Sequence, residues 1–155
     1  MGLDITAYEQ VVLVKGIDVK EYNKDDGAQS LAEENGHTYL CNVPSGPPQA
    51  DGMPDGVYRT EGGRVGFRAG SYGGYNAWRH WLSLTMLGMT PERIWAMTDA
   101  GRAGLPFVEL INFSDCEGFI GPQTCAKLAR DFAQHKHKIP RGADEYDVQK
   151  YNQWQ

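Results

Sequence analysis

Apolar and polar residues alternate at the start of the chain. Leu3, Ile5 and Ala7 are each separated by one residue from the next, and an apolar run follows at Val11–Val14. A period of two is typical of a β-strand with one buried face, and a short apolar run favours a second strand. The pattern therefore predicts one or two strands over Leu3–Lys15.

Further segments show strand-like patterns bounded by turn residues. They are His37–Val43, a hairpin of Val57–Arg59 and Arg64–Arg68 across Glu61-Gly62-Gly63, and Phe107–Phe113 with a return strand at Phe119-Ile120. The segment Phe107–Phe113 is the clearest, because Phe107, Glu109, Ile111 and Phe113 fall on one face of an extended chain. A short helix is predicted over Ser30–Gly36, where Ser30 would cap the start and Gly36 the end.

Apolar residues at helical spacing predict the remaining elements. The predicted helices are Asn76 to about Met86, Pro91 to Met97 capped by Thr90, Pro122 to about His135, and a short one in the tail after Gly142. The predicted buried faces are Trp78, Trp81, Leu82, Thr85 and Met86 in the first, and Cys125, Leu128, Ala129 and Phe132 in the third.

This order of elements predicts an α+β fold. Strands come first, then a helix, a strand pair and a helix, which favours a largely antiparallel sheet with two main helices packed on it. At 155 residues the chain is long enough for one hydrophobic core, so we expect a single domain over residues 1–155.

Charge and composition exclude several classes of partner. The formal net charge of −5 argues against duplex nucleic acid, which needs a basic surface. The start of the chain has neither a basic region nor a long apolar core, and no segment is long enough to span a membrane, so we expect no signal peptide and no membrane association. Three cysteines without C-x-x-C spacing indicate reduced thiols rather than disulfides or zinc, which fits a cytosolic protein.

The segment Phe67–Trp81, FRAGSYGGYNAWRHW, combines glycines, arginines and aromatic residues. Glycines let a backbone approach a ligand closely, arginines bind phosphate or carboxylate, and aromatic rings stack on planar groups. A nucleotide-like ligand site is therefore one interpretation, and a purely structural loop and helix is the other. The candidate ligand-binding residues are Arg68, Ser71, Tyr72, Tyr75, Asn76 and Arg79. We expect Arg79 to face the ligand and Arg68 to have the more structural role.

Acidic residues give a second candidate site. If Glu109 is buried on its strand it needs a cationic partner, for which Arg68 or Arg79 is the natural choice. Together with Asp115 and Glu117 it could instead hold Mg²⁺ and act in a hydrolase. A solvated acidic turn with one ion pair explains the same residues more simply, so no metal and no cofactor are expected.

Three segments resemble one family. MGLDITAY, FRAGSYGGYNAWR and ELINFSDCEGFIGPQTCAKLARDF are similar to segments of small, largely uncharacterised proteins of bacteriophages and prophages. The resemblance implies a phage accessory protein in the cytoplasm of an infected bacterium, and it implies no known reaction. Such proteins often counter host defences, so by analogy we expect one that sequesters a nucleotide-derived signal of the cyclic nucleotide or cyclic ADP-ribose type.

Pockets for such ligands are often shared between subunits, so a homo-oligomer is expected. Two alternatives stay open. One is a phosphodiesterase or related hydrolase of such a nucleotide that uses Glu109, Asp115 and Glu117. The other is a protein-interaction module that inhibits a host enzyme through exposed aromatic residues.

Overall fold

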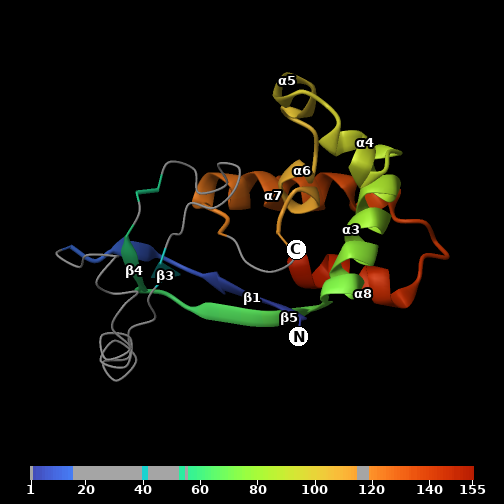
Figure 1. Cartoon of the computed structure of the whole chain (residues 1–155). Coiled ribbons are helices and arrows are strands. Elements are labelled where there is room, and N and C mark those ends of the chain that lie inside the picture. Colours follow the sequence, from blue (N-terminus) through green and yellow to red (C-terminus); the bar gives the residue numbers. More distant parts are fainter. Residues whose placement is uncertain (1, 16–39, 42–52, 55, 115–118) are drawn as a thin grey trace.

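The computed structural model describes residues 2–15, 40–41, 53–54, 56–114 and 119–155 (Figure 1). Small antiparallel sheets and a group of helices make up these residues, which confirms the predicted α+β class. Among them, no helix has both the length and the apolar character needed to cross a bilayer. The predicted helix at 30–36, most of the predicted strand at 37–43 and the acidic turn at 115–118 lie outside the described residues.

The strands form two small sheets. The first pairs β1 (Gly2–Tyr8) with β5 (Arg64–Ser71), and the second has the order β2 (Val11–Leu13), β4 (Val57–Thr60), β3 (Leu40–Cys41). All of the pairs are antiparallel. The prediction of one or two strands over Leu3–Lys15 is therefore confirmed, and the number is two.

The predicted hairpin across Glu61-Gly62-Gly63 is wrong. The strands on either side of it pair with the start of the chain instead of with each other. The Glu9 N–H donates to Gly63 O at 2.9 Å and the Glu61 N–H donates to Gln10 O at 3.1 Å, so the two sheets continue into one another through a bend. Gln10 takes φ 53° at this bend. A glycine pair allows a bend as readily as a reversal, and the local sequence cannot tell the two apart.

Strand β5 leads directly into the longest helix, α3 (Tyr72–Leu87). Ser71 ends β5 and caps α3, because its Oγ accepts a hydrogen bond from Gly74 N at 3.0 Å. The helix ends at Gly88, as predicted, with φ 66°. It starts four residues earlier than the predicted Asn76, because Gly73 and Gly74 belong to its first turn rather than to a loop.

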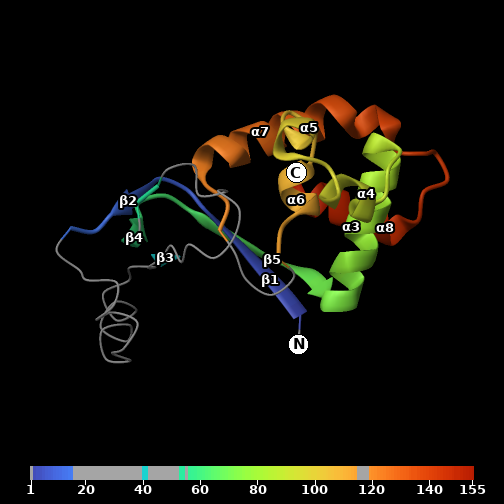
Figure 2. The ribbon, with the colours of Figure 1, turned by 45° about the horizontal axis from the view of Figure 1, so that its top comes forward.

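The other helices pack around α3 (Figures 1 and 2). They are α4 (Pro91–Trp95), α5 (Asp99–Arg102), α6 (Val108–Ile111), α7 (Pro122–His135), the 3₁₀ turn η1 (Lys136–Lys138) and α8 (Glu145–Trp154). The helices predicted from Pro91, from Pro122 and in the tail are confirmed. The β2–β4–β3 sheet projects away from this helical group in both views.

The predicted strand Phe107–Phe113 is wrong, because the segment forms α6 and its flanks. Phe107 caps this one-turn helix with a left-handed φ of 61°, and its N–H donates to Asp131 Oδ2 at 2.9 Å. Apolar residues point inward on several sides of this turn, so alternation does not report an extended chain here. The return strand expected at Phe119-Ile120 is not formed either.

The core lies between the helices α3, α6, α7 and α8 and the sheet of β1 and β5. Its largest fully buried side chains include Trp78, Tyr75, Tyr151, Phe107 and Phe132. Trp78 stacks on Trp154 of α8, with ring centroids 5.7 Å apart.

Two predicted core positions of α7 are wrong, since Cys125 and Ala129 are exposed. Thr124 and Asp131 are buried on that helix with Leu128 and Phe132. The buried stripe is therefore rotated relative to the predicted one, because Asp131 is drawn inward by the backbone N–H of Phe107.

Candidate functional site

The predicted ligand-binding residues fall into two groups. Arg68, Ser71 and Tyr72 lie where β5 meets α3. The Arg68 side chain is 60% exposed and lies 3.5 Å from the Asp4 carboxylate. The Ser71 Oγ accepts the capping hydrogen bond from Gly74 N. This junction therefore presents one exposed arginine, paired at the surface with an acid.

The second group faces the interior. Tyr75 is fully buried and its hydroxyl donates to Leu110 O at 2.9 Å, so its ring cannot stack on a ligand. Arg79 Nη1 donates to Phe113 O at 2.8 Å, and Nη2 of the same guanidinium donates to Asn76 Oδ1. Arg79 thus ties α3 to the chain that follows α6.

The glycines of this segment have a packing role. Gly70 has φ 125°, and a Cβ there would lie 3.0 Å from the Tyr146 hydroxyl of α8. A Cβ at Gly74 would lie 3.3 Å from the same oxygen. The structural interpretation therefore accounts for these two glycines, because both leave room for Tyr146.

Glu109 pairs with Lys127 rather than with an arginine, so the expected Arg68 or Arg79 partner is wrong. Lys127 Nζ lies 2.5 Å from Glu109 Oε2 and 3.0 Å from Asp131 Oδ2. The segment was predicted as a strand, but it forms α6, and this helix turns Glu109 toward α7. Asp115 and Glu117 lie outside the described residues, and the described residues hold no cluster of three or more His, Cys, Asp or Glu side chains suited to a metal.

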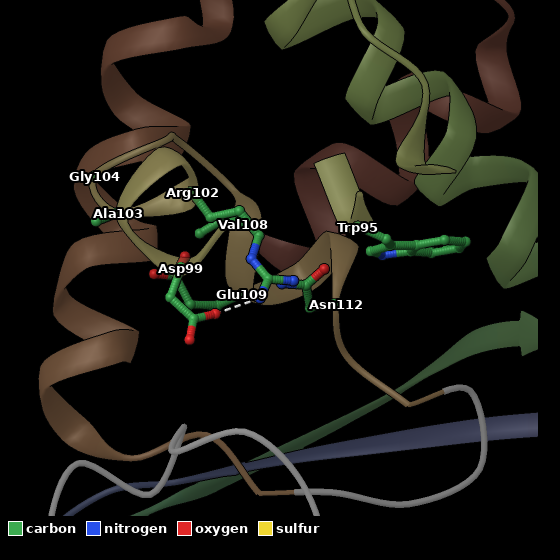
Figure 3. A pocket seen from close by; sticks show the side chains of 8 residues that line it. All are labelled: Trp95, Asp99, Arg102, Ala103, Gly104, Val108, Glu109 and Asn112. Atoms are coloured by element: carbon green, nitrogen blue, oxygen red, sulfur yellow. Dashed lines mark hydrogen bonds and ion pairs between the residues drawn. The ribbon is translucent and has the colours of Figure 1, made fainter. Parts of the chain in front are cut away.

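A hollow of about 530 Å³ opens between α4, α5 and α6 (Figure 3). It is lined by Trp95, Asp99, Arg102, Ala103, Gly104, Val108, Glu109 and Asn112. Of these, only Glu109 was singled out from the sequence. The others come from short helices and turns that carry no recognisable motif, so the chain's periodicity does not reveal them.

Trp95 forms one wall of this hollow, which we call the Trp95 hollow. Its side chain is 43% exposed, although it is a large aromatic residue. The Arg79 guanidinium lies 5.3 Å from the Trp95 ring centroid and 5.4 Å from that of Tyr75. This cation–π contact, with the backbone bonds of Arg79, holds the indole in place at the rim. Arg79 therefore belongs to the site, as a support for Trp95.

Polar groups line the floor and the opposite wall. Arg102 Nη2 forms an ion pair with Asp99 Oδ1, whose side chain is 97% exposed. Asn112 Oδ1 is buried and has no hydrogen-bond partner in the described part of the chain. An unsatisfied buried acceptor of this kind costs about 1–3 kcal/mol. The Trp95 hollow thus joins a flat ring and a guanidinium, and the Asn112 oxygen lies buried beside it.

Comparisons with known proteins identify no related protein. A scan of the chain against protein-family models, a search of curated proteins and a search of solved structures each find no match. The function is therefore argued from the chemistry of the site.

Proposed function

We propose that this protein binds a small nucleotide-derived molecule in the Trp95 hollow and holds it without converting it. The observation that carries the proposal is the Trp95 ring, which is 43% exposed at the edge of the hollow and is contacted by the Arg79 guanidinium. An aromatic face fixed in this way is a stacking platform for a planar base, and such stacking is worth about 1–3 kcal/mol per base.

The size and lining of the hollow fit a ligand of this class. A volume of about 530 Å³ lies within the range typical of small-molecule sites. Arg102 supplies a planar fork of donors suited to a phosphate oxygen, and its present partner Asp99 is a solvent-exposed side chain. An exposed ion pair is weak, so a ligand phosphate can replace Asp99 at little cost.

The resemblance to phage accessory proteins supports a biological setting for this activity. In an infected bacterium, a protein that captures a cyclic nucleotide or a cyclic ADP-ribose-type signal would silence the defence that depends on it. Such capture requires tight binding and no turnover. The expected homo-oligomer belongs to the same proposal, and sedimentation of the protein with and without ligand tests it separately.

Calorimetry on the folded chain tests the binding proposal. The panel holds nucleoside monophosphates, cyclic mono- and dinucleotides and cyclic ADP-ribose. We expect at least one of them to bind, and Trp95→Ala to weaken that binding by at least about tenfold, the loss of one stacked base. Leu84→Ala is the matched control, because Leu84 is 44% exposed on the neighbouring helix α3 and does not line the hollow.

Two results would contradict the proposal. One is folded protein that binds no member of the panel, and the other is Trp95→Ala that binds as tightly as the unchanged chain. Mass spectrometry of the ligand recovered after denaturation decides between holding and hydrolysis. Intact ligand supports the binder, and cleaved product would move the proposal to the hydrolase alternative.

A further inference from the structure

We infer that Asp99 is an internal competitor for the Arg102 guanidinium, so that the Trp95 hollow admits ligands with an anionic group and rejects neutral nucleosides. A phosphate or phosphodiester of the ligand takes the place of the Asp99 carboxylate on Arg102. This inference rests on the proposed function and adds a charge requirement to it.

Asp99 and Arg102 stand at the two ends of the single turn of α5. Arg102 Nη2 and Asp99 Oδ1 form an i,i+3 ion pair, and both residues line the hollow. Figure 3 shows this pair as a dashed line. Because only two residues separate them, the carboxylate is tethered beside the guanidinium at a high local concentration, and a ligand anion has to compete with it.

The exposure of the two side chains allows the exchange. The Asp99 side chain is 97% exposed, whereas only 28% of the Arg102 side chain is exposed. A carboxylate at such an exposed position is hydrated by water as soon as it leaves its partner, so its departure from the guanidinium costs little. Arg102, in contrast, keeps most of its side chain packed against the protein when the partner changes.

The other carboxylate of the hollow is fixed in place. Glu109 Oε2 lies 2.5 Å from Lys127 Nζ, which also lies 3.0 Å from Asp131 Oδ2, and the Glu109 side chain is only 22% exposed. A partly buried ion pair of this kind resists separation, because each charge would be left without its partner. Asp99 is therefore the carboxylate that an incoming anion replaces.

The strength of the ion pair sets the size of the competition. Exposed ion pairs favour the paired state by about 1.4- to 5-fold, which leaves the guanidinium released from Asp99 for about a sixth to two fifths of the time. The apparent affinity for an anion is reduced by this released fraction, so removing the carboxylate should strengthen anion binding by about two- to sixfold. A neutral ligand makes no use of the released guanidinium and should gain nothing.

Two ligands test each variant: the nucleotide of the panel that binds most tightly, and the nucleoside that carries the same base. We expect the nucleotide to bind at least about fivefold more tightly than the nucleoside. Arg102→Gln should bring the two affinities within about twofold of each other, because the charged fork that meets the phosphate is gone. Asp99→Asn should strengthen nucleotide binding by about two- to sixfold and leave nucleoside binding unchanged.

A double-mutant cycle shows whether the gain passes through Arg102. In the Arg102→Gln background, Asp99→Asn should give no gain, since no guanidinium remains to be released. Glu92→Gln is the matched control, because it removes one negative charge from the exposed surface of α4 without releasing Arg102, and it should change neither affinity. No residue of α5 is buried, so Asp99→Asn should fold with a nearly unchanged melting temperature.

The outcomes separate this inference from the function on which it rests. The competition is overturned if Asp99→Asn fails to strengthen nucleotide binding, if the nucleoside or Glu92→Gln shows the same gain, or if the gain persists without Arg102. Equal binding of nucleotide and nucleoside overturns the charge requirement and leaves a protein that binds the nucleoside part. Failure of every nucleotide to bind overturns the proposed function as well.

Discussion

Tyr151 shows how burial acts on a single residue. It is fully buried, and its hydroxyl donates to Phe132 O at 2.6 Å. Burial, and to a lesser degree the negative charge of Asp131, raises the pKa of Tyr151 to about 12. In the unfolded chain the same hydroxyl loses its proton near pH 10.

This difference predicts the alkaline stability of the protein. Below pH 10 both states keep the proton, so the contribution of Tyr151 is fully present. Between about pH 10 and 12 only the unfolded state releases it, so stability falls as the pH rises. Tyr151→Phe should melt at a lower temperature at pH 7, because Phe132 O loses its donor, but its melting temperature should fall less steeply above pH 10. Melts from pH 7 to 11.5 check this, and equal slopes would contradict it.

The two arginines of the glycine-rich segment differ in their partners. Arg79 Nη1 donates to Ile111 O and Phe113 O, whereas Arg68 makes one exposed ion pair with Asp4. Arg79→Ala should lower the free energy of unfolding by roughly 2–3 kcal/mol, since it strips buried carbonyls of a charged donor. Arg68→Ala should lower it by less than about 1 kcal/mol.

Urea unfolding of the two variants measures both values. The expected order reverses the roles that the sequence suggested, because those roles assumed that Glu109 lies on a strand. A larger loss for Arg68→Ala than for Arg79→Ala would contradict the structural roles assigned to both residues.

At the scale of elements, the junction of β5 and α3 contains glycines whose roles can be tested by substitution. Gly70 has φ 125° and faces Tyr146, whereas a Cβ added at Gly73 would meet no neighbouring atom within 4 Å. Gly70→Ala should therefore lower the free energy of unfolding by about 1–3 kcal/mol through backbone strain. Gly73→Ala, in the first turn of the helix, should raise it by up to about 1 kcal/mol. Thermal and urea melts of both variants check the pair, and equal effects would contradict the need for glycine at the left-handed φ of position 70.

Elements with local signals were predicted well. Thr90 and Pro91 mark the start of α4, Gly88 ends α3, and Pro122 opens α7, because caps and prolines act through their own neighbouring backbone groups. The helix α8 was also expected. Each of these depends on only a few adjacent residues.

Elements that depend on residues far away in the sequence were not predicted well. The pairing of β5 with β1 rather than β4 is decided by residues about sixty positions away in the chain, and α6 is fixed by Asp131 of α7 holding the Phe107 N–H. A short apolar segment such as Phe107–Phe113 fits a strand or a buried turn equally well until its neighbours are known.

At the scale of the whole molecule, the candidate site combines residues that the sequence separates. Trp95 of α4, Arg102 of α5 and Asn112 after α6 line one hollow, and Arg79 of α3 contacts the Trp95 ring. Arg79 and Glu109 were recognised in advance from their residue types, but for other roles. The position of the site could not be predicted, because it depends on how segments far apart in the sequence pack together.

The central claim is that a nucleotide stacks on Trp95, and the indole N–H signals of the protein test it most directly. The chain has four tryptophans, so a ¹⁵N-labelled sample gives four such signals, and Trp95→Phe assigns the one of interest. On titration with the nucleotide of the panel that binds most tightly, we expect the Trp95 indole signal to move, while the signal of buried Trp78 stays in place. An unmoved Trp95 signal, with shifts gathered instead at Ser71 and Tyr72, would contradict the account and return the ligand to the junction of β5 and α3.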